Sequence, residues 1–234
     1  MNGSAGFLAE EFWWLKALER PLEGYVGVAR SWWTPYPETP GWREYPGRIN
    51  LQELSNWASK SNWENGHRTL AVYVNDREST GIVGPFLIDS DCDEELAGPD
   101  GTLHPPQLAK AQQLAISVAN RYLDQGIPEQ DLRAYFSWHK GFHLELFMRN
   151  RPAFHTIGAN NTDGGAWRSE REKLRAEFGT ETSPAIDRPH LHVRLKRSWN
   201  VWTAKACVVR LAIQELGTMT ISEIQVKARL SALE

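Results

Sequence analysis

The chain has 234 residues, of which 41% are hydrophobic and 24% charged, and its formal net charge is −3. This balance excludes wholesale disorder, and the slightly acidic total means that any surface for nucleic acid must be local. Two cysteines, Cys92 and Cys207, are too few for a disulfide framework or a cysteine-rich zinc site. No apolar run is long enough to span a bilayer, so we predict a cytoplasmic protein without a membrane partner.

The first third of the chain is rich in tryptophan and proline. A helix with a wide apolar stripe is predicted over 7–18, where Trp13 and Trp14 are adjacent and therefore cannot share one face. Residues 31–48 mix prolines and glycines with aromatic side chains, which favours an irregular packed loop. Those aromatic residues could stack on nucleobases or anchor the loop on the core, and anchoring is the simpler interpretation. A further helix is predicted over 50–60.

The rest of the chain alternates strand and helix patterns. Four strands are predicted, over residues 68–75, 85–91, 132–137 and 142–148, the first two as a hairpin. Helices are predicted over residues 105–125, 166–178, 203–216 and 222–233. Residues 186–195 fit a strand or an ordered loop. This order predicts an α+β fold with a mostly antiparallel sheet covered by helices.

Two acidic residues end the apolar run of residues 85–91. Side chains alternate along a strand, so Asp89 and Asp91 are expected on one face. Two neighbouring carboxylates repel each other, and a divalent cation such as Mg²⁺ or Mn²⁺ is the natural counter-charge. The alternative is a solvated acidic turn, since further acids follow at positions 93–95.

A second group of polar residues surrounds the turn between the strands predicted over 132–137 and 142–148. The group comprises Ser137, His139, Lys140, Gly141 and His143. Hydroxyl, imidazole and ammonium donors suit an anion such as phosphate, and glycine permits close approach of the backbone. The alternative is a hairpin tip that is merely polar, although this explains Ser137 and His143 poorly because they flank the turn inside apolar strands.

A third motif lies near the most basic part of the chain. Asp187 follows an apolar residue, as Asp89 does, and Arg194 and Ser198 come after it within a run of basic side chains. Taken alone, this run fits a solvated basic loop.

The three motifs together resemble the archaeo-eukaryotic primase superfamily over roughly residues 70–216. This superfamily comprises primases, primase-polymerases and the polymerase domains of bacterial end-joining ligases. The resemblance implies that Asp89, Asp91 and Asp187 are catalytic carboxylates that bind Mg²⁺ or Mn²⁺. It also implies a nucleotide-binding set formed by Ser137, His139, Lys140, Gly141, His143, Arg194 and Ser198. Two positions depart from the usual pattern, with Trp138 in place of a glycine and Asn200 in place of a histidine.

The resemblance further implies an RRM-like palm over residues 70–216. Residues 1–69 would be a helical, aromatic-rich segment packed on that palm, and residues 217–234 a C-terminal helix that could begin a further region. The implied function is a DNA-templated nucleotidyltransferase that makes primers on single-stranded DNA or extends strands along it by two-metal phosphoryl transfer. Its partners would be the template, an NTP or dNTP, and a helicase or other replication protein.

Three alternatives remain open at this point. The triplet His190-Leu191-His192 is also found in replication and mobilisation endonucleases of the HUH type, which need a downstream tyrosine nucleophile. The last tyrosine of this chain is Tyr135, upstream of the triplet. A metal-dependent nuclease could use the same acids but would not need the 137–143 turn. A non-catalytic module that binds single-stranded DNA is the third alternative.

Overall fold

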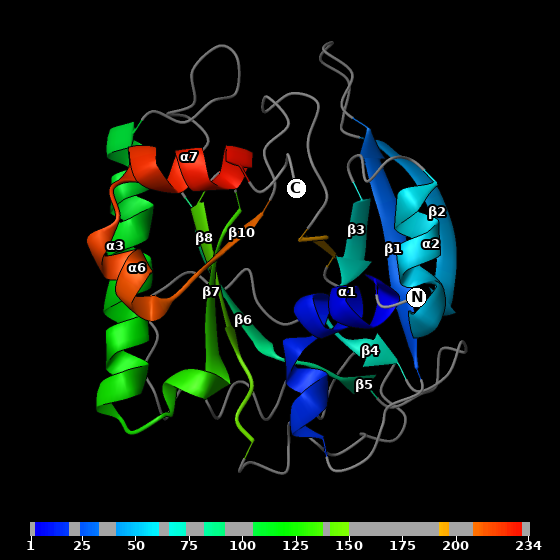
Figure 1. The fold of residues 1–234 in the computed structure, drawn as a ribbon, viewed down its shortest axis with the longest axis horizontal. Coiled ribbons are helices and arrows are strands. Elements are labelled where there is room, and N and C mark those ends of the chain that lie inside the picture. The colour runs from blue at the N-terminus through cyan, green and yellow to red at the C-terminus, as the bar shows by residue number, and fades with distance from the viewer. Residues whose placement is uncertain are drawn as a thin grey trace.

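Two antiparallel β-sheets with accompanying helices make up the described part of the chain (Figure 1). The computed structural model describes residues 3–18, 24–32, 41–60, 66–73, 82–91, 105–137, 141–149, 192–196 and 208–230. The predicted α+β class with antiparallel pairing is confirmed, but the strands form two sheets where one was predicted. Among the described helices, none combines the length and the apolar character needed to cross a membrane.

The first sheet is built mainly from the N-terminal third of the chain. Its order is β5-β4-β1-β3-β9, and β2 also pairs with β1. The strands are β1 (Tyr25–Trp32), β2 (Gly41–Asn50), β3 (Gly66–Thr69), β4 (Val72–Tyr73), β5 (Ile82–Val83) and β9 (His192–Arg194). The sheet therefore joins the N-terminal strands to a strand more than a hundred residues later in the chain.

The irregular loop predicted over 31–48 is wrong at both of its ends, because residues 31–32 belong to β1 and residues 41–48 to β2. The register of these strands contains a bulge, in which two residues of β2 lie opposite one residue of β1. Pro46 is one of these two β2 residues. Proline has no backbone N–H to donate to the neighbouring strand, and a bulge tolerates this. Residues 33–40 lie outside the described residues.

The hairpin predicted from residues 68–75 and 85–91 is not formed. The first run divides into β3 and β4 around a bend at Leu70-Ala71, and β4 pairs with β5. The second run contains all of β6, which belongs to the second sheet and pairs with β8. The acidic residues of this run therefore belong to the second sheet.

The second sheet has the order β10-β7-β8-β6. Its strands are β6 (Phe86–Asp91), β7 (Leu132–Phe136), β8 (Gly141–Leu146) and β10 (Val209–Leu211). The strands predicted over 132–137 and 142–148 are confirmed as β7 and β8. The prediction of a helix over 203–216 is wrong for residues 209–211, which form β10. Val209 and Leu211 are buried while Arg210 is exposed, and this alternation is typical of a strand.

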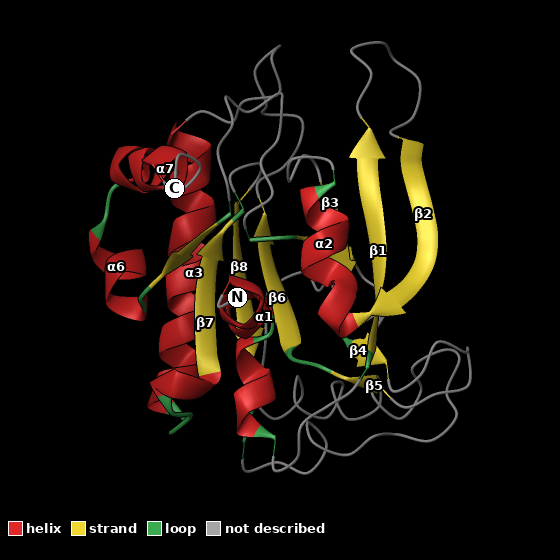
Figure 2. Cartoon of the chain, turned by 45° about the vertical axis from the view of Figure 1, so that its right-hand side comes forward, coloured by secondary structure: helices red, strands yellow, loops and turns green. Residues whose placement is uncertain are grey.

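Helices cover one side of the second sheet, as Figure 2 shows. They are α3 (Pro105–Asp124), α6 (Ile213–Thr218) and α7 (Ile221–Leu230). The helix predicted over 105–125 is confirmed, and it stops before Gly126, whose φ of 83° favours glycine. The buried Gln112 amide of α3 donates to Leu216 O and Met219 O, both at 2.8 Å, and so holds the end of α6 against α3.

The N-terminal helices lie near the first sheet and between the two sheets (Figure 1). They are α1 (Gly3–Glu11), the 3-10 helices η1 (Trp13–Ala17) and η2 (Leu51–Glu53), and α2 (Leu54–Ser59). A third 3-10 turn, η4 (Glu129–Asp131), precedes β7. The helix predicted over 7–18 thus divides in two, and both Trp13 and Trp14 are buried. The Trp14 ring stacks on Phe147 with ring centroids 5.2 Å apart, which joins η1 to the end of β8.

Gly84 lies where the chain passes from β5 to β6, and a side chain there has no room. A Cβ atom would approach the Ala71 Cα to 2.9 Å. We therefore expect Gly84→Ala to lower the free energy of unfolding by about 1–3 kcal/mol, because backbone has to shift to admit the methyl group. The matched control is Gly217→Ala in α6, where no atom lies within 4 Å of the new Cβ. Urea unfolding of both variants checks this, and equal midpoints would contradict it.

Candidate nucleotide and metal site

The second sheet has one apolar and one polar face. On one side of the sheet, α3 and α6 pack on the strands and α7 packs on α3. The strand residues on this side are buried and apolar: Phe86, Ile88, Leu132, Ala134, Phe136, Phe142, Leu144, Leu146, Val209 and Leu211. The intervening positions carry most of the chemistry, and we call them the polar face: 89 and 91 of β6, Arg133 and Tyr135 of β7, His143 and Glu145 of β8, and Arg210 of β10. The predicted metal-binding and phosphate-binding strands therefore share one surface.

The strand register places the first two motifs directly beside each other. Asp89 lies opposite His143, and Asp91 lies opposite Gly141, in the antiparallel pair of β6 and β8. Residues that face each other in such a pair have Cβ atoms about 4.5–5.5 Å apart and share a face. Two predicted carboxylate ligands and two predicted nucleotide-binding residues are thus neighbours across one pair of strands.

Ser137 closes the turn that carries the second motif. Its hydroxyl donates to Gly141 O at 3.0 Å and accepts from Gly141 N at 3.3 Å, while the Ser137 backbone N also donates to Gly141 O at 3.0 Å. The buried hydroxyl thus holds the two ends of the turn at a fixed separation. His139 and Lys140 lie outside the described residues. Ser137 would have to release Gly141 O before its proton could reach a phosphate.

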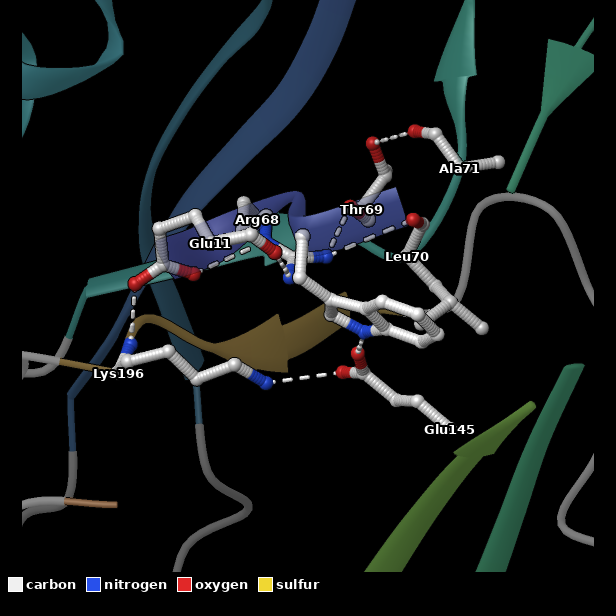
Figure 3. A network of polar contacts seen from close by, with 8 residues as sticks. Glu11, Arg68, Thr69, Leu70, Ala71, Glu145 and Lys196 are labelled. Atoms are coloured by element: carbon white, nitrogen blue, oxygen red, sulfur yellow. Dashed lines mark hydrogen bonds and ion pairs between the residues drawn. The ribbon is translucent and has the colours of Figure 1, made fainter. Parts of the chain in front are cut away.

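The third motif reaches this region through β9. Arg194 lies in β9 opposite His67 of β3, at the edge of the first sheet. Two residues later, Lys196 Nζ forms an ion pair with Glu145 Oε1 of β8 at 2.8 Å. The Lys196–Glu145 pair therefore ties the strand of the third motif to the strand of the second (Figure 3). Asp187 and Ser198 lie outside the described residues.

Glu145 is held ionised inside the protein. It is 1% exposed, and its second oxygen accepts from Trp13 Nε1 at 2.8 Å. Burial acts to raise the pKa of Glu145, but the charges of Lys196 and Arg68 and the hydrogen bonds from Lys196 and Trp13 outweigh it, so the pKa lies below its ordinary value. Lys196 also lies over the Tyr135 ring, with Nζ 3.5 Å from the ring centroid. A rigid charged contact thus supports the middle of the polar face.

A second buried ion pair extends this network to α1. Glu11 and Arg68 have fully buried side chains, and Arg68 Nε donates to Glu11 Oε2 at 3.1 Å. Glu11 also accepts from the backbone N of Lys196, and Arg68 donates to the carbonyls of Glu11 and Thr69. Burial raises the pKa of Glu11 more than its partners lower it. Two carboxylates and two cations balance in charge where α1, β3, β8 and the end of β9 meet (Figure 3).

Comparison with known proteins gives structural similarity only. No protein family model matches the sequence. No curated protein matches it either. The fold is similar to the polymerase domain of Mycobacterium tuberculosis Ligase D in complex with DNA, with a TM-score of 0.47 and 12% sequence identity over 98% of this chain and 89% of that chain. Similarity at this level assigns neither a family nor an activity.

The donors predicted to hold a divalent ion fit the ion in type. Positions 89 and 91 lie two apart on one face of β6, and carboxylate oxygens are the ligands that Mg²⁺ and Mn²⁺ prefer. The described residues contain no group of three His, Cys, Asp or Glu side chains that could hold a metal. The third predicted ligand, Asp187, belongs to the part of the chain that is not described.

The sequence did not indicate four residues that lie on the polar face or contact it. They are Arg133, Glu145, Lys196 and Arg210. The alternation of His143 and Glu145 with buried Phe142 and Leu144 does place Glu145 beside His143, so that signal is present in the sequence. Lys196 has no local signal, because its partner lies 51 residues away.

Proposed function

We propose that this protein is a template-dependent nucleotidyltransferase of the primase-polymerase type, acting on single-stranded DNA with NTPs or dNTPs. The observation that carries the proposal is the register of β6 and β8, which sets Asp89 opposite His143 and Asp91 opposite Gly141. Nucleotidyl transfer requires metal-binding carboxylates next to the groups that hold the triphosphate. The three motifs would supply both, and the Lys196–Glu145 pair supports the proposal because it ties the residue two positions after Arg194 to β8.

Each part of the site has a role under this proposal. Asp89, Asp91 and Asp187 would hold Mg²⁺ or Mn²⁺, which supplies positive charge for the triphosphate and acidifies the attacking 3′-hydroxyl. His139, Lys140 and Arg194 would offset the negative charge of the incoming nucleotide, while Ser198 and the backbone at Gly141 orient it.

His143 follows the 137–141 turn on the same face as position 89, and it would donate a hydrogen bond to the triphosphate. Ser137 would first hold the turn closed and then reorient toward the phosphates.

The domain arrangement follows from the same proposal. Residues 70–216 would form the RRM-like catalytic palm, with residues 217–234 as a C-terminal region. Residues 1–69 would pack against the palm and also join it through the first sheet, in which β1 pairs with β4 and β3 pairs with β9. Trp13 and Glu11 make the contacts across the first boundary, to Glu145 and to the backbone of Lys196. The N-terminal segment would therefore stabilise the site from the side of the polar face, on which Glu145 lies.

The HUH endonuclease alternative is not favoured by the surroundings of Tyr135. This side chain is 2% exposed, and Lys196 lies over its ring. Burial and the nearby Glu145 carboxylate raise the pKa of Tyr135 well above its ordinary value, which is the opposite of what a tyrosine nucleophile needs. A non-catalytic module that binds single-stranded DNA would not require the paired acids at positions 89 and 91.

Synthesis on a circular single-stranded DNA without primer tests the proposal. Reactions contain labelled NTPs or dNTPs with Mg²⁺ or Mn²⁺ and run beside the Asp89→Ala/Asp91→Ala variant. We expect products that are absent from the variant reaction. Extension of an annealed primer without primer-free products would restrict the activity to elongation. Nicking or degradation of the template without synthesis would overturn the proposal in favour of a nuclease.

A further inference from the structure

Two arginines occupy the end of the polar face that is farthest from β6. Arg210 of β10 lies opposite Tyr135, so Arg133, two residues before Tyr135 on β7, is its diagonal neighbour on the same face. Arg210 is exposed and Arg133 is half-buried. Within the described ranges, no carboxylate lies at ion-pair distance from either guanidinium. Two positive charges therefore lie close together without an ion pair among the described residues. Glu145 is the cross-strand neighbour of Arg133, but its carboxylate is already paired with Lys196.

Arg133 is held in place by contacts that include no ion pair among the described residues. Its Cζ atom lies 4.8 Å from the centroid of the Trp13 ring, and its Nη1 makes one long hydrogen bond, of 3.4 Å, to Leu132 O. The buried Nε has no hydrogen-bond partner in the described part of the chain. Burial lowers the pKa of Arg133, and the charge of Arg210 lowers it further. A bound anion would relieve both effects.

The neighbouring arginine Arg149 provides a contrast. Its Nε lies 2.8 Å from Asp131 Oδ1, so an ion pair offsets its charge within the fold, although neither of these two atoms makes a hydrogen bond of good geometry. Arg68 is likewise paired with Glu11. The folded chain thus pairs Arg149 and Arg68 with carboxylates, whereas the described residues provide no such partner for Arg133 or Arg210.

The location of the pair indicates the kind of anion. Three strand spacings separate position 89 on β6 from Arg210 on β10, which corresponds to about 14 Å. A triphosphate held beside positions 89 and 91 would not reach both arginines. Because Tyr135 and Glu145 are buried, a polynucleotide strand would reach the arginines along the β10 edge of the sheet and not across its face. The polar face is therefore acidic at one edge and basic at the other, as expected for a surface that holds reacting groups at one end and a strand backbone at the other.

We propose that Arg133 and Arg210 form a phosphate-binding site for the backbone of a single-stranded nucleic acid. The identity of the bound strand as template or primer DNA rests on the proposed function. The site positions the strand and does not read its sequence, because guanidinium contacts to phosphate carry no base information. The Trp13 ring holds the Arg133 side chain toward the strand.

Equilibrium binding of a fluorescent oligo-dT strand tests the site without requiring catalysis. Anisotropy titrations at several salt concentrations, without nucleotide or metal, compare the wild type with Arg210→Gln, Arg133→Gln and the double variant. Loss of one phosphate contact should weaken binding about tenfold and reduce the slope of log K against log salt by about 0.7. The matched control is Arg121→Gln on α3, which packs on the opposite side of the sheet.

Arg210→Gln decides the outcome, because this exposed side chain can be replaced without disturbing the core. A reduced salt slope for Arg210→Gln together with an unchanged slope for Arg121→Gln supports the site. If Arg210→Gln and Arg121→Gln reduced the salt slope equally, the effect would come from net charge, and the proposed site would be overturned. An unchanged affinity and salt slope for the double variant would also overturn it, as would a wild type that does not bind the oligo-dT strand. Weaker binding of a nucleoside triphosphate with normal strand binding would also overturn it. Primer synthesis by a double variant with normal strand binding would reject this site and leave the proposed function standing.

Discussion

Replacement of Asp89 or Asp91 by asparagine is expected to reduce nucleotide incorporation by about 1,000-fold while leaving the protein folded. Both positions lie near the end of β6. Under the proposed function, their carboxylates bind the metal ion that neutralises the reacting phosphates. Removal of one carboxylate ligand forfeits several kcal/mol of transition-state charge stabilisation, and each 1.36 kcal/mol corresponds to a tenfold change in rate. Single-turnover incorporation on a primed template, at equal folded concentration, measures the effect.

The matched control for these variants is Asp124→Asn, at the exposed C-terminal end of α3. It removes the same charge from the same protein at a place remote from the polar face, so incorporation should stay within about twofold of the wild type. Titration of Mn²⁺ by its paramagnetic resonance signal gives an independent measurement. Near-normal synthesis by either site variant, or unchanged Mn²⁺ binding by both, would contradict the assignment of Asp89 and Asp91.

Arg68→Met is expected to cause the largest loss of stability among single substitutions in the buried network, about 3–5 kcal/mol of the free energy of unfolding. The change leaves Glu11 with a fully buried carboxylate and without its guanidinium partner. An uncompensated buried charge lowers the free energy of unfolding by far more than the intact ion pair adds to it. Chemical denaturation monitored by tryptophan fluorescence measures the loss, and Arg210→Met at an exposed position should stay within about 0.5 kcal/mol of the wild type.

The effect of Arg68→Met should also depend on pH. Burial raises the pKa of Glu11 above its unfolded value, so the folded state binds its proton more tightly, and stability falls as pH rises from the unfolded pKa through the folded one. Removal of Arg68 raises the folded pKa further. The variant should therefore lose less stability at pH 5 than at pH 8, and Glu11→Gln should restore part of the loss at pH 8. An equal loss at both pH values would contradict this account of Glu11.

Local patterns predicted the elements of the second sheet well. The stripe of α3 is long and regular, and all of its predicted core positions are buried: Leu108, Ala111, Ala115, Val118, Ala119 and Tyr122. The β7–β8 hairpin followed from two short apolar runs around a polar turn. These features depend on neighbours in the sequence, which explains why a single sequence suffices to predict them.

Long-range pairing could not be predicted in the same way. No local sequence signal near residues 85–91 indicates that β6 pairs with β8, while the preceding strand β5 pairs with β4 in the other sheet. The three residues 209–211 form a strand because β7 offers them an edge, whereas their own sequence fits a helix equally well. The candidate acids and the turn were found from the sequence, but their face-to-face register and the Lys196–Glu145 support required the fold.

The late position of β9 in the chain has a consequence for folding during synthesis. Strands β1 to β5 leave the ribosome early, yet β3 obtains its outer neighbour only when residues 192–194 have been made. Until then, the backbone groups along one edge of β3 have no strand partner. Glu11 likewise lacks the backbone N–H of Lys196, which lies 185 residues later in the chain. Contacts of this sequence separation are formed slowly because long loops must close first. The nascent N-terminal half should therefore be the species most prone to aggregate or to need a chaperone.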